Sequence, residues 1–233
     1  MEIITDKSIF DINNPYPEVH KLNPDSEILI FNDFLKKPDE YKDLLMKIPA
    51  FASDYFYPTS SPGWRQLIPY EFYNSMEKLF SNWTGFNPWV EQGFTNLYKD
   101  NMPCNCKAWY PHHDNKEYVV NLWLSDGPGG TGFYTWQNHY QGVYLPPHIQ
   151  EQVFSKQVKG DFEYEEFTGD ECWNLYHMEP LRYNRAIFYN GNNFHSAYLP
   201  KGYFKTEWRY SLVLMGGVDE GGIDQGSEGV CLP

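Results

Sequence analysis

The sequence predicts an α+β chain that is mainly β, with helices in its first part and a β-rich region after about residue 90. Apolar residues recur at helical spacing in two segments before that point. After it come short runs of β-branched and aromatic residues separated by turn signals. Aromatic residues make up 18% of the 233 residues, which favours strands and an aromatic-lined pocket. A β-rich core covered by helices, as a sheet or a barrel, is the expected architecture.

The first elements are set by turn signals and by one helical pattern. Residues 1–26 hold Asn-Pro turn signals and are expected to be mostly irregular, whereas the apolar run 27–31 predicts a strand. Pro38, followed by two acidic residues, is typical of the first turn of a helix. Apolar side chains then recur at helical spacing up to Pro49, which ends the pattern.

A second helix is expected after a loop. Residues 50–70 are rich in Pro, Ser, Gly and aromatics, so we interpret them as an exposed loop. Asn74 is a candidate cap for a helix that carries Met76, Leu79, Phe80 and Trp83. A strand is expected at 92–98.

The rest of the chain predicts strands around one long irregular segment. Residues 137–180 are polar, with a short helix expected near 148–157, and a segment this long is commonly functional or mobile. We predict a single domain with an N-terminal helical layer (1–95), a β core (96–217) with an insertion (137–180), and a flexible tail (218–233). The strands expected in the core are 107–113, 118–124, 131–136, 185–189 and 208–215.

Composition excludes several classes of protein. The net charge of −13 and the pI near 4.9 argue against binding to nucleic acid or to an anionic membrane surface. Four cysteines show no disulfide framework. The first residues do not resemble a signal peptide, and no segment has the length of a membrane span. We therefore expect a cytoplasmic protein in a reducing compartment.

Three residues form a candidate metal site. His112 and Asp114 are two positions apart, so on a strand both side chains point to one face, while His113 faces away. His195 is a candidate third ligand. Two imidazoles and one carboxylate hold Fe(II) and leave open positions. Arg209 offers a fixed cation for a carboxylate.

These motifs resemble the Fe(II)/2-oxoglutarate-dependent oxygenases, and among them the prolyl-4-hydroxylase-like branch. The family pattern of His-x-Asp, a distal His and Arg-x-Ser is similar to His112 to Asp114, His195, and Arg209 to Ser211. The hairpin at 122–133, the strand before His195 and the strand–helix unit at 27–46 are also similar in kind. The resemblance covers residues 27–215.

The resemblance implies a double-stranded β-helix (jelly-roll or cupin-like) barrel and an oxygenase activity. His112, Asp114 and His195 would bind Fe(II), and Arg209 with Ser211 would bind the co-substrate 2-oxoglutarate. Tyr110, two positions before His112, would share its face and donate a hydrogen bond to the co-substrate. The implied reaction is a dioxygenase hydroxylation with O2, releasing succinate and CO2, of a peptidyl or small-molecule substrate.

The spacing departs from the family pattern at two places. Asp114 and His195 are 81 positions apart, and the excess falls in 137–180. His195 and Arg209 are 14 positions apart, which implies extra residues in the turn between the last two strands and leaves Lys205 as an alternative anchor.

Other functions are open. Cys104 and Cys106, with His112 and His113, would give a zinc-stabilised structural protein, although the one-residue gap is unlike the usual zinc spacing. A non-catalytic cupin-like binding module is a second alternative, which intact ligands argue against. A third is an iron halogenase, in which a small residue replaces the carboxylate; the presence of Asp114 favours hydroxylation.

Aromatic side chains in the two irregular segments are candidates for the substrate mouth. The glycine-rich stretch 127–132 lacks the lysine and helix of a phosphate-binding loop, so we interpret it as a hairpin turn. The mouth candidates, chosen from loop placement, are Tyr55, Tyr57, Trp64, Tyr140 and Tyr144.

Overall fold

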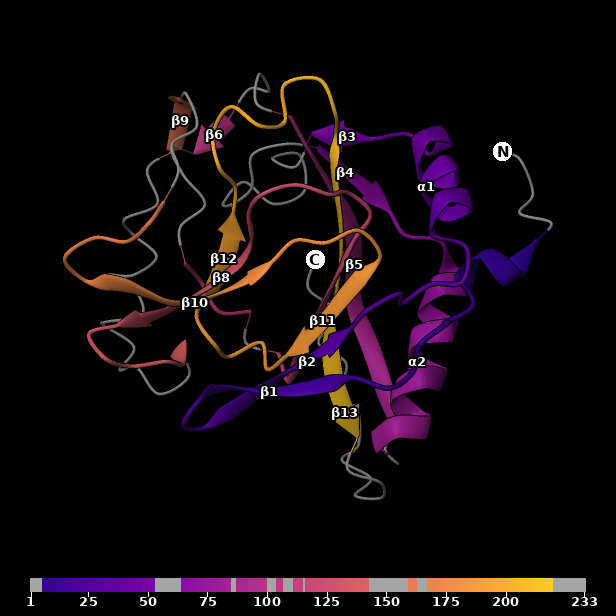
Figure 1. Cartoon of the computed structure of the whole chain (residues 1–233), viewed down its shortest axis with the longest axis horizontal. Helices are drawn as coiled ribbons and strands as arrows, with labels where there is room; N and C mark the ends of the chain where they lie inside the picture. The colour runs from indigo at the N-terminus through magenta and orange to yellow at the C-terminus, as the bar shows by residue number, and fades with distance from the viewer. Residues whose placement is uncertain are drawn as a thin grey trace, which may run out of the picture.

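The structure, a computed structural model, contains two α-helices and antiparallel β-sheets in the residues that it describes (Figure 1). It describes residues 6–52, 64–84, 87–99, 104–106, 111–114, 116–142, 159–162 and 167–219. The predicted class, mainly β with a few helices, is confirmed. In this part of the chain the strands form open sheets, and the barrel expected from the sequence is not closed.

The larger sheet has eight strands, and it brings the two ends of the described chain together. The N-terminal strand β2 pairs with β11, and the C-terminal strand β13 lies between β7 and β5. In spatial order its strands are β1 (Glu18–Asn23), β2 (Ser26–Phe31), β11 (Arg185–Tyr189), β7 (Tyr118–Trp123), β13 (Arg209–Asp219), β5 (Asn87–Tyr98), β4 (Trp64–Leu67) and β3 (Phe51–Ala52).

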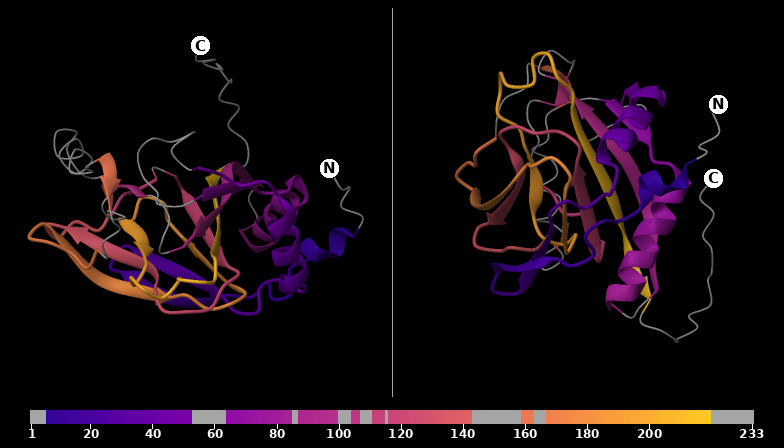
Figure 2. Two further views of the ribbon diagram at one scale, coloured as in Figure 1. Left: turned by 90° about the horizontal axis from the view of Figure 1, so that it is seen from above. Right: turned by 45° about the vertical axis from the view of Figure 1, so that its right-hand side comes forward.

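Both helices cover one face of this sheet (Figures 1 and 2). α1 (Pro38–Lys47) begins with proline in its first turn and acidic residues near its positive end, as the sequence predicts. Buried side chains of α1 and α2 (Tyr70–Thr84) pack with alternate residues of β2, β7 and β13. Tyr41, Phe72 and Leu212 belong to this cluster. We call this side of the sheet its helix face.

The other face of the sheet, which we call its inner face, packs toward a smaller sheet. That sheet has the order β10 (Trp173–Pro180), β8 (Gly130–Trp136) and β12 (His195–Tyr198). Phe133 of β8 joins a buried cluster with Trp123, Ile187 and Tyr189 of the larger sheet. Side chains at alternate positions of the central strands therefore enter the space between the two sheets.

A third pairing and one short helix complete the described elements. β6 (Cys104–Cys106) pairs with β9 (Lys159–Phe162). The 3-10 helix η1 (Lys7–Phe10) packs near α1 and α2. No helix in the described part of the chain is long and apolar enough to cross a membrane.

Six predicted strands, at 27–31, 92–98, 118–124, 131–136, 185–189 and 208–215, and the first helix are confirmed, but several boundaries were wrong. Residues 107–110 of the expected strand 107–113 lie outside the described residues. Residues 18–23 form a strand, although the N-terminus was expected to be irregular. Part of the expected loop 50–70 forms β3 and β4. α2 begins at Tyr70, so Asn74 lies inside the helix and does not cap it. β5 begins at Asn87, five residues before its predicted start.

The segment 137–180 is not irregular throughout. Its last residues form β10, which pairs with β8 along its whole length and forms the edge of the smaller sheet. Residues 159–162 form β9. The helix expected near 148–157 lies outside the described residues, as does the tail after Asp219. Ten residues, 199–208, connect β12 to β13, as the long His195-to-Arg209 spacing predicts.

Candidate metal centre

His112 and His195 lie directly opposite each other on two adjacent strand segments. Their main chains exchange two hydrogen bonds, His112 N to His195 O at 3.0 Å and His195 N to His112 O at 2.9 Å. Side chains of such an antiparallel pair point to the same side. The two imidazole rings are accordingly 4.7 Å apart, centroid to centroid. The smaller sheet therefore brings together two histidines that are 83 positions apart in sequence.

Asp114 reaches the same point from just beyond this pairing. Its main-chain N–H donates to the carbonyl of Gly191 at 2.9 Å, which holds the chain close to the loop before β12. A Cβ atom on Gly191 would lie 2.6 Å from the carbonyl oxygen of Lys116, so this close approach requires glycine. Asp114 is in this way fixed by main-chain contacts, and its carboxylate is available for a cation.

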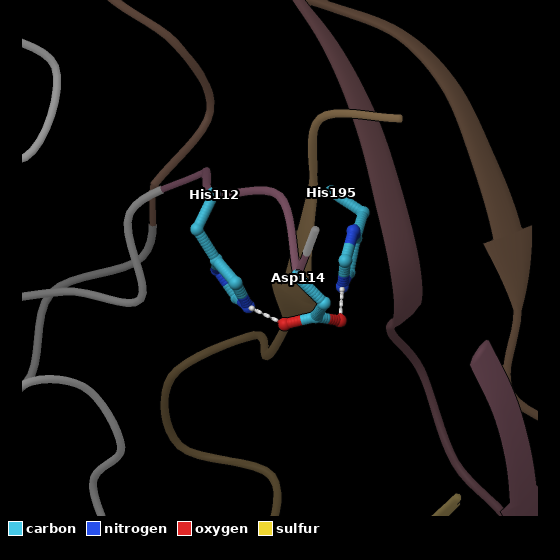
Figure 3. Close-up of side chains that lie close together, drawn as sticks. All are labelled: His112, Asp114 and His195. Atoms are coloured by element: carbon cyan, nitrogen blue, oxygen red, sulfur yellow. Dashed lines mark ion pairs between the residues drawn. The ribbon is translucent and has the colours of Figure 1, made fainter. Parts of the chain in front are cut away.

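The three side chains converge with the Asp114 carboxylate between the two imidazoles (Figure 3). His195 Nε2 lies 3.1 Å from Asp114 Oδ2, and His112 Nε2 lies 3.7 Å from Asp114 Oδ1. All three ligand atoms lie within 4.8 Å of one another. Ligands on adjacent corners around an ion with bonds of about 2.1 Å are roughly 3 Å apart. The arrangement therefore fits one metal ion after a small rotation of His112, whose side chain is 34% exposed.

His195 is the most deeply held of the three. Its side chain is 7% exposed, and its Nδ1 lies 2.9 Å from the main-chain carbonyl oxygen of Asn193. A carbonyl oxygen only accepts, so Nδ1 donates to it, and Nε2 is the ring nitrogen left to bind a metal ion. The ring of Tyr189 packs edge-on against the imidazole at 4.9 Å. Nε2 is therefore directed toward Asp114 before any ion binds.

The electrostatics of Asp114 favour its charged form. Burial alone would raise the pKa of this carboxyl group, but the neighbouring histidines, His195 foremost, lower it to about 2. A carboxylate that is negatively charged over the whole physiological range, beside two imidazoles, suits a divalent cation.

This pKa shift predicts how metal-free stability depends on pH. Because the pKa of Asp114 is lower in the folded chain, its contribution is present above the unfolded value of 3.8 and is lost as pH falls toward about 2. We expect the free energy of unfolding of the wild type, relative to Asp114→Asn, to fall by on the order of 2 kcal/mol across that window. Urea unfolding with a chelator present, from about pH 5 down to the lowest pH with a cooperative transition, measures it. A difference in unfolding free energy between the wild type and Asp114→Asn that does not change with pH would contradict this prediction.

His113 lies beside the site and is not one of the three converging side chains. Its ring packs against Phe194 at 5.9 Å and covers Gly142, where an added Cβ would lie 2.0 Å from the ring. Burial lowers the pKa of His113, which favours its neutral form. This position agrees with the alternation that the sequence predicts.

Arg209 and Ser211 lie on the inner face of the larger sheet. Side chains two positions apart on a strand point to the same face. Val213 and Met215, which continue this spacing along β13, pack in the cluster between the two sheets. Arg209 is 2% exposed, and Ser211 is buried as well. Lys205, the alternative anchor, is exposed in the loop between β12 and β13. The position of Arg209 therefore suits an internal anion better than the position of Lys205 does.

A buried polar group beside Tyr189, which packs against His195, was not predicted from the sequence. Asn121 Nδ2 donates to the hydroxyl of Tyr189 at 3.2 Å and to Thr131 Oγ1 at 3.1 Å. Burial, and to a smaller extent the Asp114 charge, raises the pKa of Tyr189, so its phenol keeps its proton. A single polar residue in the apolar run 118–124 was the signal that could have identified Asn121. Tyr110, the expected hydrogen-bond donor, lies outside the described residues.

A second buried guanidinium was also missed. Arg65 of β4 is 6% exposed, and its guanidinium stacks over the ring of Phe94 at 3.9 Å. It pairs with Asn96, which in turn pairs with Ser211, so the three lie in one row across adjacent strands. The inner face therefore carries Arg65 and Arg209 as well as Arg185 of β11, which is also buried but pairs with the Glu179 carboxylate at 2.7 Å.

Two of the five mouth candidates can be placed. Trp64 pairs with Leu97, a member of the helix-face cluster, and packs near Trp208 at 6.3 Å. It therefore lies on the helix face, away from the inner face, and its assignment to the mouth was wrong. Tyr140 packs against Tyr176 at 5.0 Å, and its carbonyl accepts from Phe194 N, one residue before His195. The other candidates, Tyr55, Tyr57 and Tyr144, and the side chains of Cys104 and Cys106 lie outside the described residues.

The fold and the three converging side chains define an antiparallel β-protein with a candidate His-Asp-His metal site. Residues 13–206 match a family of unknown function, DUF6445, and the chain belongs to that family. No curated protein matches the chain.

Several solved structures resemble this chain distantly. One is an oxidoreductase of the 2OG-Fe(II) oxygenase family from Burkholderia pseudomallei, with 10% identity and a TM-score of 0.43, over 81% of this chain and 82% of that chain. Another is the non-heme alpha ketoglutarate dependent epimerase SnoN from nogalamycin biosynthesis, with 15% identity and a TM-score of 0.48, over 88% of this chain and 90% of that chain. A third is the epimerase SnoN in complex with Fe3+, alpha ketoglutarate and nogalamycin RO, with 16% identity and a TM-score of 0.39, over 81% of this chain and 78% of that chain.

Proposed function

We propose that this protein is an Fe(II)- and 2-oxoglutarate-dependent dioxygenase that hydroxylates its substrate. One observation carries the proposal: two imidazoles and one carboxylate from separate parts of the chain converge within 4.8 Å. This set on one side of an ion is diagnostic of non-heme Fe(II) oxygenases, because three further positions stay open. We expect it to act in the reducing cytoplasm, where iron stays ferrous.

The strand order supports a double-stranded β-helix, and the proposed prolyl-4-hydroxylase-like branch rests on the sequence motifs alone. The larger sheet contains the run β5, β13, β7, β11, and the smaller sheet contains β12, β8, β10 with the His112 segment beside β12. From β7 onward the chain passes from the larger sheet (β7) to the smaller one (β8 and β10), and then alternates between them through β11, β12 and β13, while β9 pairs elsewhere. We propose that the metal site lies at one end of this pair of sheets, where β12 begins.

The proposed reaction assigns a separate role to each group of residues. His112, Asp114 and His195 hold the ion on one side. When bound, Fe(II) supplies the oxidation: one oxygen atom of O2 enters 2-oxoglutarate, which leaves as succinate and CO2, and the other enters the substrate. Arg209, with Ser211, binds the distal carboxylate of 2-oxoglutarate through charge-assisted hydrogen bonds. Tyr189, whose phenol stays protonated beside His195, is positioned to take the donor role expected of Tyr110.

The buried arginine favours an enzyme over a metal-binding module. A binding module needs the three ligands only, whereas the proposed reaction also needs a cation for the co-substrate. A buried guanidinium on the inner face meets that need. The presence of Asp114 favours hydroxylation over halogenation, which requires a small residue at that position.

Anaerobic titration tests the proposed function. Fe(II) with 2-oxoglutarate is expected to give a weak metal-to-ligand charge-transfer band in the visible that neither component gives alone with the protein. On admission of air, succinate should form in a 2-oxoglutarate-dependent manner, even without the substrate. A protein that binds Fe(II) but gives neither signal would be a binding module.

The zinc alternative predicts a different result for one variant. We expect Cys104→Ala to keep both the charge-transfer band and succinate formation. Loss of folding in Cys104→Ala together with zinc release, measured by a chromogenic chelator, would support the zinc-stabilised protein instead.

A further inference from the structure

A polar cluster links the β1–β2 turn to the candidate metal centre. Its central residue is Asn193, which is 0% exposed. Asn193 Oδ1 accepts hydrogen bonds from Asn23 Nδ2 at 3.0 Å and from Ser26 Oγ at 3.1 Å. Asn193 Nδ2 donates to the carbonyl of Asn190 at 3.0 Å. The amide side chain is thus bound at both ends, by partners 170 and 3 residues away in sequence.

The main chain of the same residue contacts His195. The carbonyl oxygen of Asn193 lies 2.9 Å from His195 Nδ1, and this contact sets which ring nitrogen carries the proton. A partner on the far nitrogen of a metal-binding histidine also fixes the direction of the ring. Any rotation of the 190–193 turn would move this carbonyl and, with it, the imidazole.

The β1–β2 turn is itself rigid. Asn23 Oδ1 accepts from the main-chain N–H of Asp25 at 3.0 Å, so the side chain closes its own turn. Asn23 Nδ2 also donates to the hydroxyl of Tyr176 on β10 at 3.2 Å, which ties the turn to the smaller sheet. The turn therefore offers Asn193 donors that are held by hydrogen bonds of their own.

We propose that Asn193 is a positioning residue for the metal centre and that Asn23 and Ser26 of the β1–β2 turn hold it in place. Their hydrogen bonds to the Asn193 side chain fix the position of its main-chain carbonyl. This carbonyl accepts from His195 Nδ1–H, and the imidazole ring is thereby held with Nε2 toward Asp114. The N-terminal hairpin in this way contributes to metal affinity without supplying a ligand. This inference rests on the proposed metal centre.

Metal affinity measured without turnover tests the inference. Co(II), which is stable in air and coloured, replaces Fe(II), and its dissociation constant is measured by visible absorption in competition with a chelator. We expect Asn193→Ala to bind Co(II) about 10-fold more weakly than the wild type, because the carbonyl that holds His195 stays but loses the side-chain hydrogen bonds that fix it, and a disturbed partner of a ligating histidine lowers metal affinity by about 10- to 100-fold. Ser26→Ala, which removes one of the two donors, should give a smaller loss in the same direction.

A matched control separates positioning from stability. Gln66 is also a buried amide, 2% exposed, and it donates to the carbonyls of Leu45 and Ile48 at the end of α1. Gln66→Ala should lower the melting temperature of the metal-free protein but keep the wild-type Co(II) dissociation constant. In the Co(II) protein, the His195 Nδ1–H should give a shifted, slowly exchanging proton NMR signal in the wild type and Gln66→Ala. That signal should exchange rapidly in Asn193→Ala.

The outcomes distinguish the two proposals. Wild-type protein that does not bind Co(II) would overturn the metal centre and the inference with it. Wild-type binding combined with unchanged Co(II) affinity in both Asn193→Ala and Ser26→Ala would overturn the positioning role alone. If Asn193→Ala does not fold, Ser26→Ala and the exchange rate of the His195 signal in that variant decide the question.

Discussion

Replacement of Asp114 by alanine is expected to abolish 2-oxoglutarate turnover. The carboxylate supplies the only negative charge among the three proposed ligands, and it lies between the two imidazoles. Loss of a partner behind a ligand already costs about 10- to 100-fold in metal affinity. Loss of the ligand itself should therefore weaken Fe(II) binding by more than roughly 100-fold, and succinate formation should fall below detection. Anaerobic Fe(II) titration and a succinate assay in air measure the two effects.

The adjacent histidine is the matched control for this prediction. His113 is next to Asp114 in sequence but packs against Phe194 and Gly142, outside the group of three. His113→Gln should keep Fe(II) binding and succinate formation, although it lowers the melting temperature because packing is lost. Asp114→Ala with wild-type Fe(II) affinity would show that the metal, if any, is bound elsewhere, and the proposed function would fail.

The convergence of the three proposed ligands depends on different kinds of sequence signal. His112 and Asp114 are two positions apart, and such a spacing predicts a shared face from the sequence alone. Their approach to His195 is a long-range pairing across 83 positions, which only the resemblance to a family suggested. The Asn193 contacts with the β1–β2 turn have no local pattern, since the partners are 170 positions apart.

Strands were predictable where both faces are buried. β7 is buried at all six positions and β8 at all seven, so apolar, β-branched and aromatic residues mark them clearly. β1 and β10 are edge strands, and most of their side chains are exposed or half-buried. Their polar sequences resemble loops, because an edge strand has no need of an apolar run. Arg65 was missed for a different reason, because β4 lies between β3 and β5 but falls in the segment 50–70, whose composition is typical of a loop.

Replacement of Arg209 by alanine is expected to raise the KM for 2-oxoglutarate by about 100-fold. Truncation of one partner of a buried, hydrogen-bonded charge pair costs roughly 2 to 5 kcal/mol, and each 1.4 kcal/mol is tenfold in affinity. Arg209 is buried on the inner face of β13, where such a pair would be shielded from water. Fe(II) binding without 2-oxoglutarate should be unchanged, because the guanidinium holds the co-substrate and not the ion.

A ligand change isolates the interaction with the distal carboxylate. 2-Oxopentanoate has the 2-oxo acid group of 2-oxoglutarate but a methyl group in place of the distal carboxylate. The wild type and Arg209→Ala should bind 2-oxopentanoate equally weakly, since the group that Arg209 contacts is absent. A variant that loses affinity for both acids to the same extent would point to a damaged site and not to a lost charge pair.

Two other cations compete for the role of anchor, and their variants decide between them. Lys205 is exposed in the loop before β13, so Lys205→Ala should leave the KM for 2-oxoglutarate at the wild-type value. Arg65 is buried on the same face as Arg209, in the row of Ser211, and is the stronger competitor. If Arg65→Ala raises the KM for 2-oxoglutarate and Arg209→Ala does not, the co-substrate lies across β4 and β5.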